Sequence, residues 1–363
     1  MTKTQVAIVG GGLVGIYAAQ QLHRAGIDFV LFEARDRLGG RILTVDAFGH
    51  PSEDGVDLGP SWFWPIMQPA IGALIEEMGL SDFCQANDGD IMFERGSNQA
   101  PERYRSMEAE QPSMRIVGGT GALVRALVRE LPLDKIILGA RVGEMALTSD
   151  GVTLKVTFAD ASSQILVARK AIVALPPRLL EASVAFSPGI DAATARLWRE
   201  TPTWMAPTAK FVAHYPRAFW RDAGLSGMAQ SRVGPLAEIH DATTASGQPA
   251  LFGFFGIGAD QRTAHGQAAL THACLAQLAR IFGPMALNPS ATLIKDWTAD
   301  PLTATDLDRA GADHINPRPV PWVAQPWADG LALAGSETSP TDPGYLAGAV
   351  VAAQRAVANT LGG

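Results

Sequence analysis

The sequence predicts an α/β protein in which a doubly wound parallel sheet is joined to a second, smaller α+β domain. Within residues 5–33 a strand, a glycine-rich turn, a helix and a second strand follow one another, which is the order of a parallel βαβ unit. The chain has 363 residues, 47% of them hydrophobic, so it can bury more apolar surface than a single hydrophobic core usually contains. We therefore expect two closely joined domains.

Composition narrows the classes of function. A net charge of -7 argues against the basic surface that nucleic-acid binding needs, so we expect a small-molecule substrate and no nucleic-acid partner. Cys84 and Cys274 are the only cysteines and lie far apart, which fits buried small side chains in a reducing cytoplasm. Three glycines interrupt the apolar run 6–14, and no run approaches the ~18 apolar residues of a membrane span. We expect a soluble, cytoplasmic protein without a membrane partner.

The first forty residues indicate a dinucleotide site. The run "QVAIV" predicts a buried strand over 5–9, apolar residues at helical spacing follow as far as Gly26, and "DFVLFE" predicts a second strand. In this setting Gly10 permits the tight turn, Gly12 lets a pyrophosphate approach, and Gly15 packs the helix on the strand. A plain strand-to-helix turn is the alternative, but strand, helix and second strand in register favour a Rossmann-type nucleotide-binding fold.

An acidic residue and a basic loop follow the second strand. Glu33 ends that strand near the spacing at which an acid hydrogen-bonds a ribose hydroxyl, and its charge would repel the 2′-phosphate of NADP. In "EARDRLGGRI" (33–42), Arg35, Arg37 and Arg41 surround the pair Gly39 and Gly40, which predicts a second anion site for the same pyrophosphate. A solvated basic loop is the alternative.

With this loop the sequence resembles the flavin-containing amine oxidase family, which includes the monoamine oxidases and uses FAD. The run "DLGPSWFWP" (57–65) is similar to the family segment that passes the flavin ring. This resemblance places Gly59, Ser61 and Trp62 against the cofactor and Trp62 beside the substrate, although a buried core tryptophan is the alternative. Pro60 replaces the second glycine of the family pattern.

Further segments resemble the family in chain order. Residues 135–177 alternate as antiparallel strands with a turn at Asp150-Gly151, and the resemblance places the backbone of Val142 on the adenine. In "AKFVAHY" (209–215), Lys210 matches the lysine that holds a water against flavin N5. A surface lysine is the alternative, but this lysine interrupts an apolar strand pattern. Trp297 matches a tryptophan near the isoalloxazine.

The C-terminal run "LALAGSETSPTDPGYLAGAVVAAQRAVANTL" resembles the family's C-terminal signature most closely. It predicts a strand, a loop and a helix beginning near Gly344, whose positive end faces the flavin. The resemblance adds Gly335, Glu337, Gly344, Tyr345 and Leu346 to the predicted cofactor site, and it makes Tyr345 one wall of an aromatic cage for the substrate amine.

The sequence departs from the family pattern in two respects. No tyrosine falls where the second wall of the cage is expected, so Trp322 and His314 are the candidates. Residues 296–322 contain no cysteine, although monoamine oxidases attach their flavin to a cysteine in this region, so we expect non-covalent FAD. The seven histidines lack ligand spacing, which predicts no metal site.

The resemblance implies a division into domains and a reaction. Residues 1–78, 114–198 and 305–363 would form the FAD-binding domain, and 79–113 with 199–304 the substrate-binding domain. The expected reaction is oxidation of an amine by hydride transfer to flavin N5, giving an imine and, with molecular oxygen as acceptor, hydrogen peroxide. Lys210 and Tyr345 would be the catalytic residues. The alternatives are C–C desaturation of an apolar substrate and a flavin-binding protein without turnover.

Overall fold

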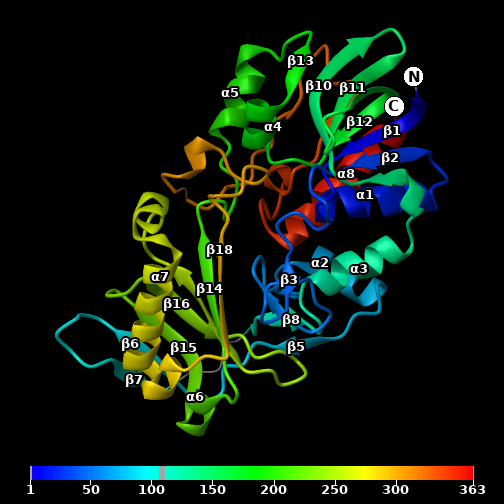
Figure 1. Ribbon diagram of the computed structural model, residues 1–363. Coiled ribbons are helices and arrows are strands. Elements are labelled where there is room, and N and C mark those ends of the chain that lie inside the picture. Colours follow the sequence, from blue (N-terminus) through cyan, green and yellow to red (C-terminus); the bar gives the residue numbers. More distant parts are fainter. Residues whose placement is uncertain (1, 106–110, 312, 363) are drawn as a thin grey trace.

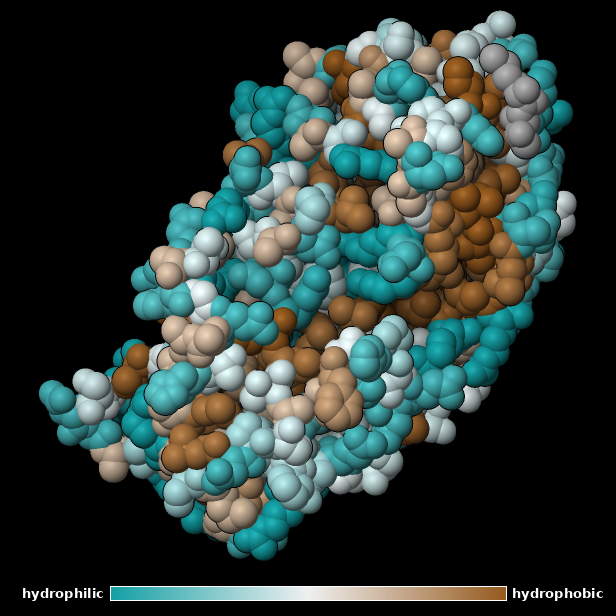
Figure 2. Space-filling model, viewed as in Figure 1, coloured by the Kyte–Doolittle hydropathy of each residue, from teal (hydrophilic) through white to brown (hydrophobic). Residues whose placement is uncertain are grey.

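The computed structural model describes residues 2–105, 111–311 and 313–362. Two large sheets lie side by side, each with its own helices, and the N- and C-termini meet at the same end of the molecule (Figure 1). Among the described helices, none is both long enough and apolar enough to cross a lipid bilayer. In the surface view, hydrophobic residues gather around α1 and continue toward the middle of the molecule, where the two halves meet (Figure 2).

The first sheet has a parallel centre and an antiparallel flank, in the order β13-β10-β11-β12-β1-β2-β9, with β19 paired to β12. The parallel strands are β1 (Thr2–Val9), β2 (Phe29–Phe32), β9 (Ile136–Ile137), β12 (Ser163–Val173) and β19 (Leu331–Leu333). The antiparallel flank consists of β10 (Ala140–Thr148) and β11 (Gly151–Phe158), and the short β13 (Ala185–Ser187) pairs in parallel with the outer edge of β10. The antiparallel turn lies at the predicted Asp150-Gly151.

Helices cover this sheet because their apolar faces require a partner. The helices α1 (Leu13–Arg24), α2 (Pro69–Glu77), α3 (Gly121–Arg129) and α8 (Leu346–Leu361) share one core cluster with β1 and β2. The helices α4 (Pro177–Ser183) and α5 (Ala192–Glu200) pack together beside β13 (Figure 1). The helix α1 ends where the sequence predicts, because Gly26 adopts a φ of 70° directly after the C-cap.

The second sheet has the order β18-β14-β17-β16-β15-β6-β7. Its strands are β18 (Ala291–Asp296), β14 (Ala209–His214), β17 (Ala250–Phe255), β16 (Leu236–Asp241), β15 (Leu225–Ser231), β6 (Asp90–Glu94) and β7 (Glu102–Tyr104). The long helix α7 (Ala259–Phe282), bent at Gly266, packs on one face. The opposite face packs against the first half of the molecule through a small apolar cluster that contains Val45, Val56, Val212 and Phe252.

Short elements connect the two halves. The strand β3 (Thr44–Val45) pairs with β4 (Val56–Asp57), and β5 (Asp82–Cys84) pairs with β8 (Met114–Ile116), both in antiparallel orientation. The remaining elements are α6 (Phe219–Asp222) and 3-10 turns at Leu133–Lys135, Pro284–Leu287, Asp306–Asp308 and Ser336–Thr338. The strands of the first sheet all lie within the ranges expected for the FAD-binding domain, and those of the second sheet within the ranges expected for the substrate-binding domain. The domain boundaries themselves stay a prediction.

Candidate functional site

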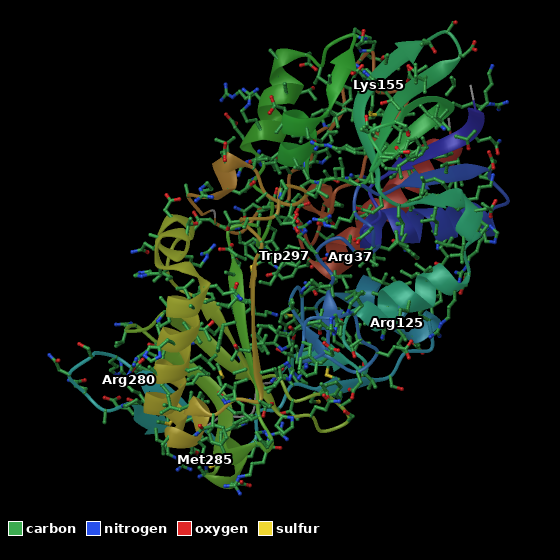
Figure 3. All side chains as sticks on the ribbon, in the orientation of Figure 1. Arg37, Arg125, Lys155, Arg280, Met285 and Trp297 are labelled. Atoms are coloured by element: carbon green, nitrogen blue, oxygen red, sulfur yellow. The ribbon has the colours of Figure 1, made fainter. Side chains whose placement is uncertain are left out.

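A cavity of about 500 Å³ lies at the carboxyl ends of the parallel strands and extends to the second sheet. The ends of open parallel sheets are where ligands bind in such folds. Lys210 lines the cavity. Most of the residues predicted to bind the cofactor line it as well, namely Gly10, Gly12, Glu33, Arg35, Gly39, Gly40, Arg41, Gly59, Ser61, Trp62, Trp297, Gly335, Gly344, Tyr345 and Leu346. Trp297, which lines the cavity, and Arg37 both lie near the centre of the molecule (Figure 3).

The three glycines of the first turn have three different surroundings. Gly10 has a φ of 104°, and a Cβ there would lie 2.9 Å from the carbonyl oxygen of Ala174. A Cβ on Gly15 would lie 1.9 Å from the carbonyl oxygen of Gly10, so this glycine allows helix and strand to pack closely. Gly12 has an ordinary extended backbone, and a Cβ there would meet no atom within 4 Å. Space therefore remains beside Gly12 in the cavity.

Two helices present uncapped N-termini to this cavity. Within the described residues, no side chain caps α1, whose N-cap is Gly12, or α8, whose N-cap is Tyr345. By contrast, the Asp191 carboxylate at the start of α5 accepts hydrogen bonds from two backbone N–H groups. The first N–H groups of a helix carry partial positive charge and attract anions. The α1 terminus therefore fits a diphosphate, and the α8 terminus fits a ring that gains negative charge.

Glu33 is held at the edge of the cavity by backbone hydrogen bonds. Its Oε2 accepts from the backbone N–H of Gly11 at 2.7 Å and its Oε1 from that of Arg35 at 2.8 Å. The guanidinium of Arg35 donates to Asp300 and Thr303, each at 2.9 Å. Burial acts to raise the pKa of Asp300, but Arg35 and Lys295 outweigh it and the pKa is lowered. Glu33 is thus fixed as an acceptor beside the glycine turn.

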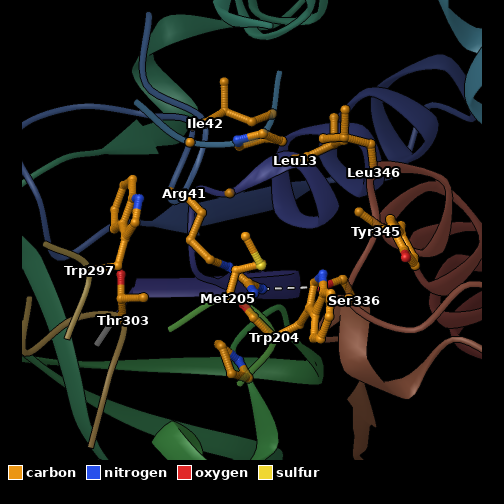
Figure 4. A pocket seen from close by; sticks show the side chains of 18 of the residues that line it. Leu13, Arg41, Ile42, Trp204, Met205, Trp297, Thr303, Ser336, Tyr345 and Leu346 are labelled. Carbon is orange, nitrogen blue, oxygen red and sulfur yellow. Dashed lines mark hydrogen bonds between the residues drawn. The ribbon is translucent and has the colours of Figure 1, made fainter. Parts of the chain in front are cut away.

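The two other arginines of the basic loop have different tasks. Arg41 lies in the cavity wall, where it pairs with the buried Glu337 at 2.7 Å and donates to Ser336 Oγ at 3.1 Å (Figure 4). Arg37 donates to the carbonyl oxygens of Leu38, Gly40 and Ile42 and so fixes the shape of the loop. Glu337 itself does not line the cavity. Its carboxylate acts on the site through Arg41.

Lys210 is fully buried at the wall of the cavity. Its ammonium donates to the carbonyl oxygens of Asp57 (2.9 Å) and Gly59 (2.8 Å) and to Ser61 Oγ (3.0 Å), which uses all three of its protons. It also lies over the ring of Phe252, 4.4 Å from the centroid. Burial lowers the pKa of Lys210 to about 7, although the charge of Asp57 opposes the shift. The strand β14 thereby fixes a group that titrates near neutral pH.

Aromatic side chains gather at the N-terminus of α8. The ring of Tyr345 lies 6.2 Å from Trp64, 6.0 Å from Trp204 and 5.0 Å from His314, measured between centroids. Trp204 packs on Gly344, where a Cβ would lie 2.4 Å from the Cβ of Trp204. Trp64 lines the cavity, as do Tyr345 and Trp204 (Figure 4). They form an apolar and π-rich wall.

A second set of aromatic residues lines the cavity on the side of the second sheet. The indole N–H of Trp62 donates to Gln85 Oε1 at 2.8 Å, and its ring contacts His240 edge-on at 4.6 Å. The indole N–H of Trp297 donates to the carbonyl oxygen of Leu58 at 3.0 Å, with the Lys295 ammonium 4.3 Å from its ring. Hydrogen bonds therefore fix the orientation of both tryptophans.

The structure does not bring every predicted residue to the cavity. Trp322 is buried in the core beneath the first sheet, where its carbonyl oxygen accepts from the indole of Trp198, so its place does not support a role in the cage. Val142 lies in β10 and packs in that same core, outside the cavity lining. Gly15 and Glu337 also lie behind the lining. His314 contacts Tyr345 and Trp204 from an exposed position.

Sequence reasoning missed several residues that line the cavity, among them Trp64, Trp204, Met205, Glu238, Phe254 and Thr303. Met205 adopts a φ of 61°, which is rare for a side chain of its size and which no sequence pattern announces. A short signal did exist for Glu238, since residues 237–240 ("AEIH") alternate apolar and titratable side chains as a half-buried strand does. Trp64 lay within the segment already singled out at 57–65.

Neither cysteine lies at the cavity. Cys84 is exposed in β5, and Cys274 is buried in the core between α7 and the second sheet. A flavin in the cavity is therefore out of reach of a cysteine sulfur. Pro60, which replaces a glycine of the family pattern, lines the cavity, and its carbonyl oxygen accepts from Thr120 Oγ1 at 3.1 Å.

Comparisons with known proteins cover nearly the whole chain. The family model of flavin-containing amine oxidoreductases matches residues 13–108 and 87–361. A putative flavin-containing monoamine oxidase, AofH, from Mycobacterium tuberculosis is 24% identical, with 97% of this chain and 95% of the relative covered. Polyamine oxidase 2 from Arabidopsis thaliana is also 24% identical, over 95% of this chain and 85% of the relative.

Solved structures share the fold. Putrescine oxidase bound to putrescine superposes with a TM-score of 0.79 at 21% identity, covering 99% of both chains. Cyclohexylamine oxidase from Brevibacterium oxydans gives a TM-score of 0.77 at 21% identity, covering 98% of both chains. At this level of identity the likeness is one of architecture, and it matches the two-domain α/β fold that the sequence predicts.

Proposed function

Because this chain belongs to the flavin-containing amine oxidoreductase family, and is thus an FAD-dependent oxidoreductase, we propose that it oxidises a carbon–nitrogen bond of a small amine. A bound flavin supplies the acceptor for a hydride from the carbon next to nitrogen and returns the electrons to molecular oxygen, giving an imine and hydrogen peroxide. The observation that carries the proposal is the aromatic wall around Tyr345 beside the uncapped start of α8.

The residues that would hold the cofactor fit its chemical groups. The diphosphate would lie at the open N-terminus of α1, next to Gly12 and within reach of Arg41. Glu33, already oriented by two backbone N–H groups, would accept from a ribose hydroxyl. The N-terminus of α8 would favour negative charge on the ring system. The non-covalent attachment expected from the sequence agrees with the distant cysteines.

The aromatic wall orients the substrate. The faces of Tyr345 and Trp204 would hold the amine in an apolar environment, which favours its neutral form over the charged one. A protonated nitrogen has no lone pair to assist departure of the hydride. The rate of the reductive step should therefore rise with pH through the pKa of the bound amine.

Lys210 would act on the oxidative step. A cation buried at the cavity wall stabilises negative charge on oxygen as it is reduced, and a group with a pKa of about 7 can return the proton. All three of its protons are donated to Asp57, Gly59 and Ser61, so a water at the ammonium must share one of these contacts. This role, like that of Tyr345, follows from the family resemblance together with its place in the cavity.

The test is product formation by the FAD-loaded protein with a panel of primary, secondary and polyamines. We expect equal amounts of hydrogen peroxide and aldehyde from at least one amine, measured by a coupled peroxidase assay and by carbonyl derivatisation. A protein that retains FAD, forms no peroxide with any amine and reduces its flavin with an unsaturated or saturated hydrocarbon substrate would overturn the proposal in favour of C–C desaturation.

A further inference from the structure

The backbone of Trp204 is held at both ends by one ion pair. Its N–H donates to Glu337 Oε1 at 3.3 Å, and its carbonyl oxygen accepts from Arg41 Nη1 at 2.7 Å. Arg41 Nη1 in turn lies 2.7 Å from Glu337 Oε1, and the side chain of Glu337 is fully buried. The two side chains therefore close around a single residue, in the segment that connects α5 to β14.

Trp204 differs from the other tryptophans of the cavity in how its ring is held. The indole N–H groups of Trp62, Trp64 and Trp297 each donate a hydrogen bond to the protein. Within the part of the chain that the structure describes, no hydrogen bond holds the half-buried indole of Trp204. Its segment is irregular, with a φ of 61° at the next residue, Met205. The orientation of this ring therefore depends on packing and on the fixed backbone.

The ion pair is itself fixed from the side of the first sheet. Ser336 Oγ accepts from Arg41 Nη2 at 3.1 Å and donates to Glu337 Oε2 at 3.1 Å (Figure 4). Arg355 of α8 holds the same turn, because its guanidinium donates to the carbonyl oxygen and the hydroxyl of Thr338. Glu337 lies behind the cavity lining. Both of its carboxylate oxygens are thus engaged by the protein, and its carboxylate is directed at Trp204 and Arg41.

Arg41 belongs to the cavity as well as to this clamp. It lines the cavity, and its side chain stays 25% exposed. A guanidinium has five N–H groups, and within the described residues the contacts to Trp204, Ser336 and Glu337 leave some of them for an anion in the cavity. The same side chain can therefore meet a diphosphate and hold Trp204.

We propose that Glu337 and Arg41 are positioning residues for the substrate amine: they fix Trp204, so that the arginine that meets the diphosphate also sets the aromatic wall. This rests on the proposed function, because it explains how one wall of the same cavity is oriented. Glu337 acts on the amine through Trp204 and not by holding the cofactor, which differs from the role that the family resemblance implies. Removal of its carboxylate should loosen the wall and leave the cofactor in place.

The first experiment observes Trp204 itself. The protein is labelled with 5-fluorotryptophan and loaded with FAD, and the fluorine resonance that is absent in Trp204→Leu identifies Trp204 among the eight tryptophans. In Glu337→Leu we expect this resonance to shift or broaden, because the ring loses its fixed orientation. The other tryptophans should keep their resonances, since the ring of Trp204 contacts Tyr345 and His314 but no second indole.

A matched variant controls for the loss of a buried charge. Glu94→Leu removes another buried glutamate that pairs with an arginine, Arg280 at 2.9 Å, but it lies outside the cavity lining and should leave the Trp204 resonance in place. If Glu337→Leu does not fold, Glu337→Asp replaces it. The shorter acid keeps a charge beside Arg41 but withdraws from the Trp204 N–H, so the same change in the resonance is expected.

Titration of the apoprotein with FAD separates positioning from cofactor binding. Glu337→Leu should bind FAD as tightly as the native protein or more tightly, because Arg41 then lacks the carboxylate that shares its charge. A Glu337 that holds the cofactor directly predicts the opposite, a loss of affinity of about 10-fold or more.

A double-mutant cycle with an amine that reduces the flavin tests the link to the substrate. Glu337→Leu and Trp204→Leu should each lower kcat/KM about 10-fold, and the double variant should also fall about 10-fold rather than 100-fold, because both changes remove the same wall. Glu337→Leu combined with Trp62→Leu should be close to additive, since the ring of Trp62 contacts His240, Phe252 and Phe254 instead.

The outcomes are distinct from those of the proposed function. An unchanged Trp204 resonance in Glu337→Leu, or a loss of FAD affinity, would overturn the inference even if amines are oxidised. A displaced Trp204 resonance with full FAD affinity would support it even if no amine in the panel reacts. Where an amine does react, additive effects of Glu337→Leu and Trp204→Leu would overturn the link to the substrate.

Discussion

The two sides of the cavity differ in whether backbone groups or side chains form the wall. On the side of the first sheet the wall is largely backbone: glycine turns, strand ends and the uncapped N-termini of α1 and α8. On the side of the second sheet it consists of side chains such as Lys210, Phe254 and Glu238, aligned across neighbouring strands. A backbone wall suits a ligand with a fixed phosphate and ring geometry, whereas a wall of side chains can change with the substrate.

The backbone side is most sharply tested at Gly12. Gly12 has an extended backbone and a Cβ there would meet no atom within 4 Å, but the side chain of a valine would enter the cavity beside the start of α1. We expect Gly12→Val to fold normally and to bind FAD about 100-fold more weakly, close to 2.7 kcal/mol. Fluorescence titration of the apoprotein with FAD measures this. Gly143→Val, also at an open position but outside the cavity, is the control and should bind FAD normally.

If both variants bind FAD equally, the ligand does not lie against Gly12 and the backbone wall has another purpose. If Gly12→Val fails to fold, thermal unfolding of the apoprotein will reveal it, and Gly12→Ala offers the smaller change at the same position.

On the side-chain wall, Lys210 should have the largest effect. Its pKa is about 7 in the folded protein and 10.5 in an unfolded chain, so between these pH values only the unfolded state binds the proton. The free energy of unfolding of the apoprotein should therefore rise with pH from about 7 to 10.5, and Lys210→Met should abolish this rise. The variant also removes the donor to the buried carbonyl oxygen of Asp57, at a cost of about 1–3 kcal/mol, and the donor to the partly buried carbonyl oxygen of Gly59.

Chemical unfolding at several pH values measures the stability effect, and stopped-flow mixing of the reduced protein with oxygen measures reoxidation. We expect Lys210→Met to retain FAD and to reoxidise more slowly. Unchanged reoxidation would remove Lys210 from the oxidative step, and an unchanged pH dependence of stability would contradict its titration near neutral pH.

The aromatic wall should have a smaller effect. Trp204→Leu keeps the backbone carbonyl that accepts from Arg41 but removes the ring next to Tyr345. The loss of one aromatic face from an amine site is worth about 1–2 kcal/mol, so kcat/KM for amines should fall about 10-fold. FAD affinity should stay constant. A fall in FAD affinity without a change in kcat/KM would assign Trp204 to the cofactor instead.

The smallest effect is expected at Gln85, which does not reach the cavity itself. Gln85→Leu removes the acceptor of the Trp62 indole, with a net loss of about 1 kcal/mol, so KM for the amine should rise about 3- to 5-fold with kcat nearly unchanged. Gln99→Leu, at an exposed position, is the control. An equal change in kcat and KM in Gln85→Leu would show that Trp62 is not merely a binding surface.

The difference between the backbone wall and the side-chain wall also explains which parts of the site the sequence could predict. The backbone side depends on consecutive residues, so the turn at Gly10, the end of α1 before Gly26 and the start of α8 close to Gly344 were all foreseen. The side-chain side depends on strand register. Lys210 is indicated by its resemblance to a family segment and by its place in an apolar strand pattern, whereas no pattern aligns Glu238 with its partner Phe254, which follows 16 residues later on another strand.

Trp322 shows that the position of a residue in an irregular segment is hard to predict from the sequence. Its loop has no periodicity that would indicate which side faces the cavity, and the indole is buried with Trp327 in the core of the first sheet. Trp204 lies in a similar loop, and its position follows from contacts with Gly344 and Glu337, which are distant in sequence. Such contacts exist only once the two halves of the chain have come together.

One measurement tests directly whether the two walls serve a single reaction. The purified, FAD-loaded protein is mixed with an amine of the panel under nitrogen, and the visible absorbance of the flavin is followed in time. We predict that the yellow colour bleaches in step with the release of one aldehyde per flavin and returns when oxygen is admitted. A flavin that dithionite reduces but that keeps its full colour with every amine would contradict the account.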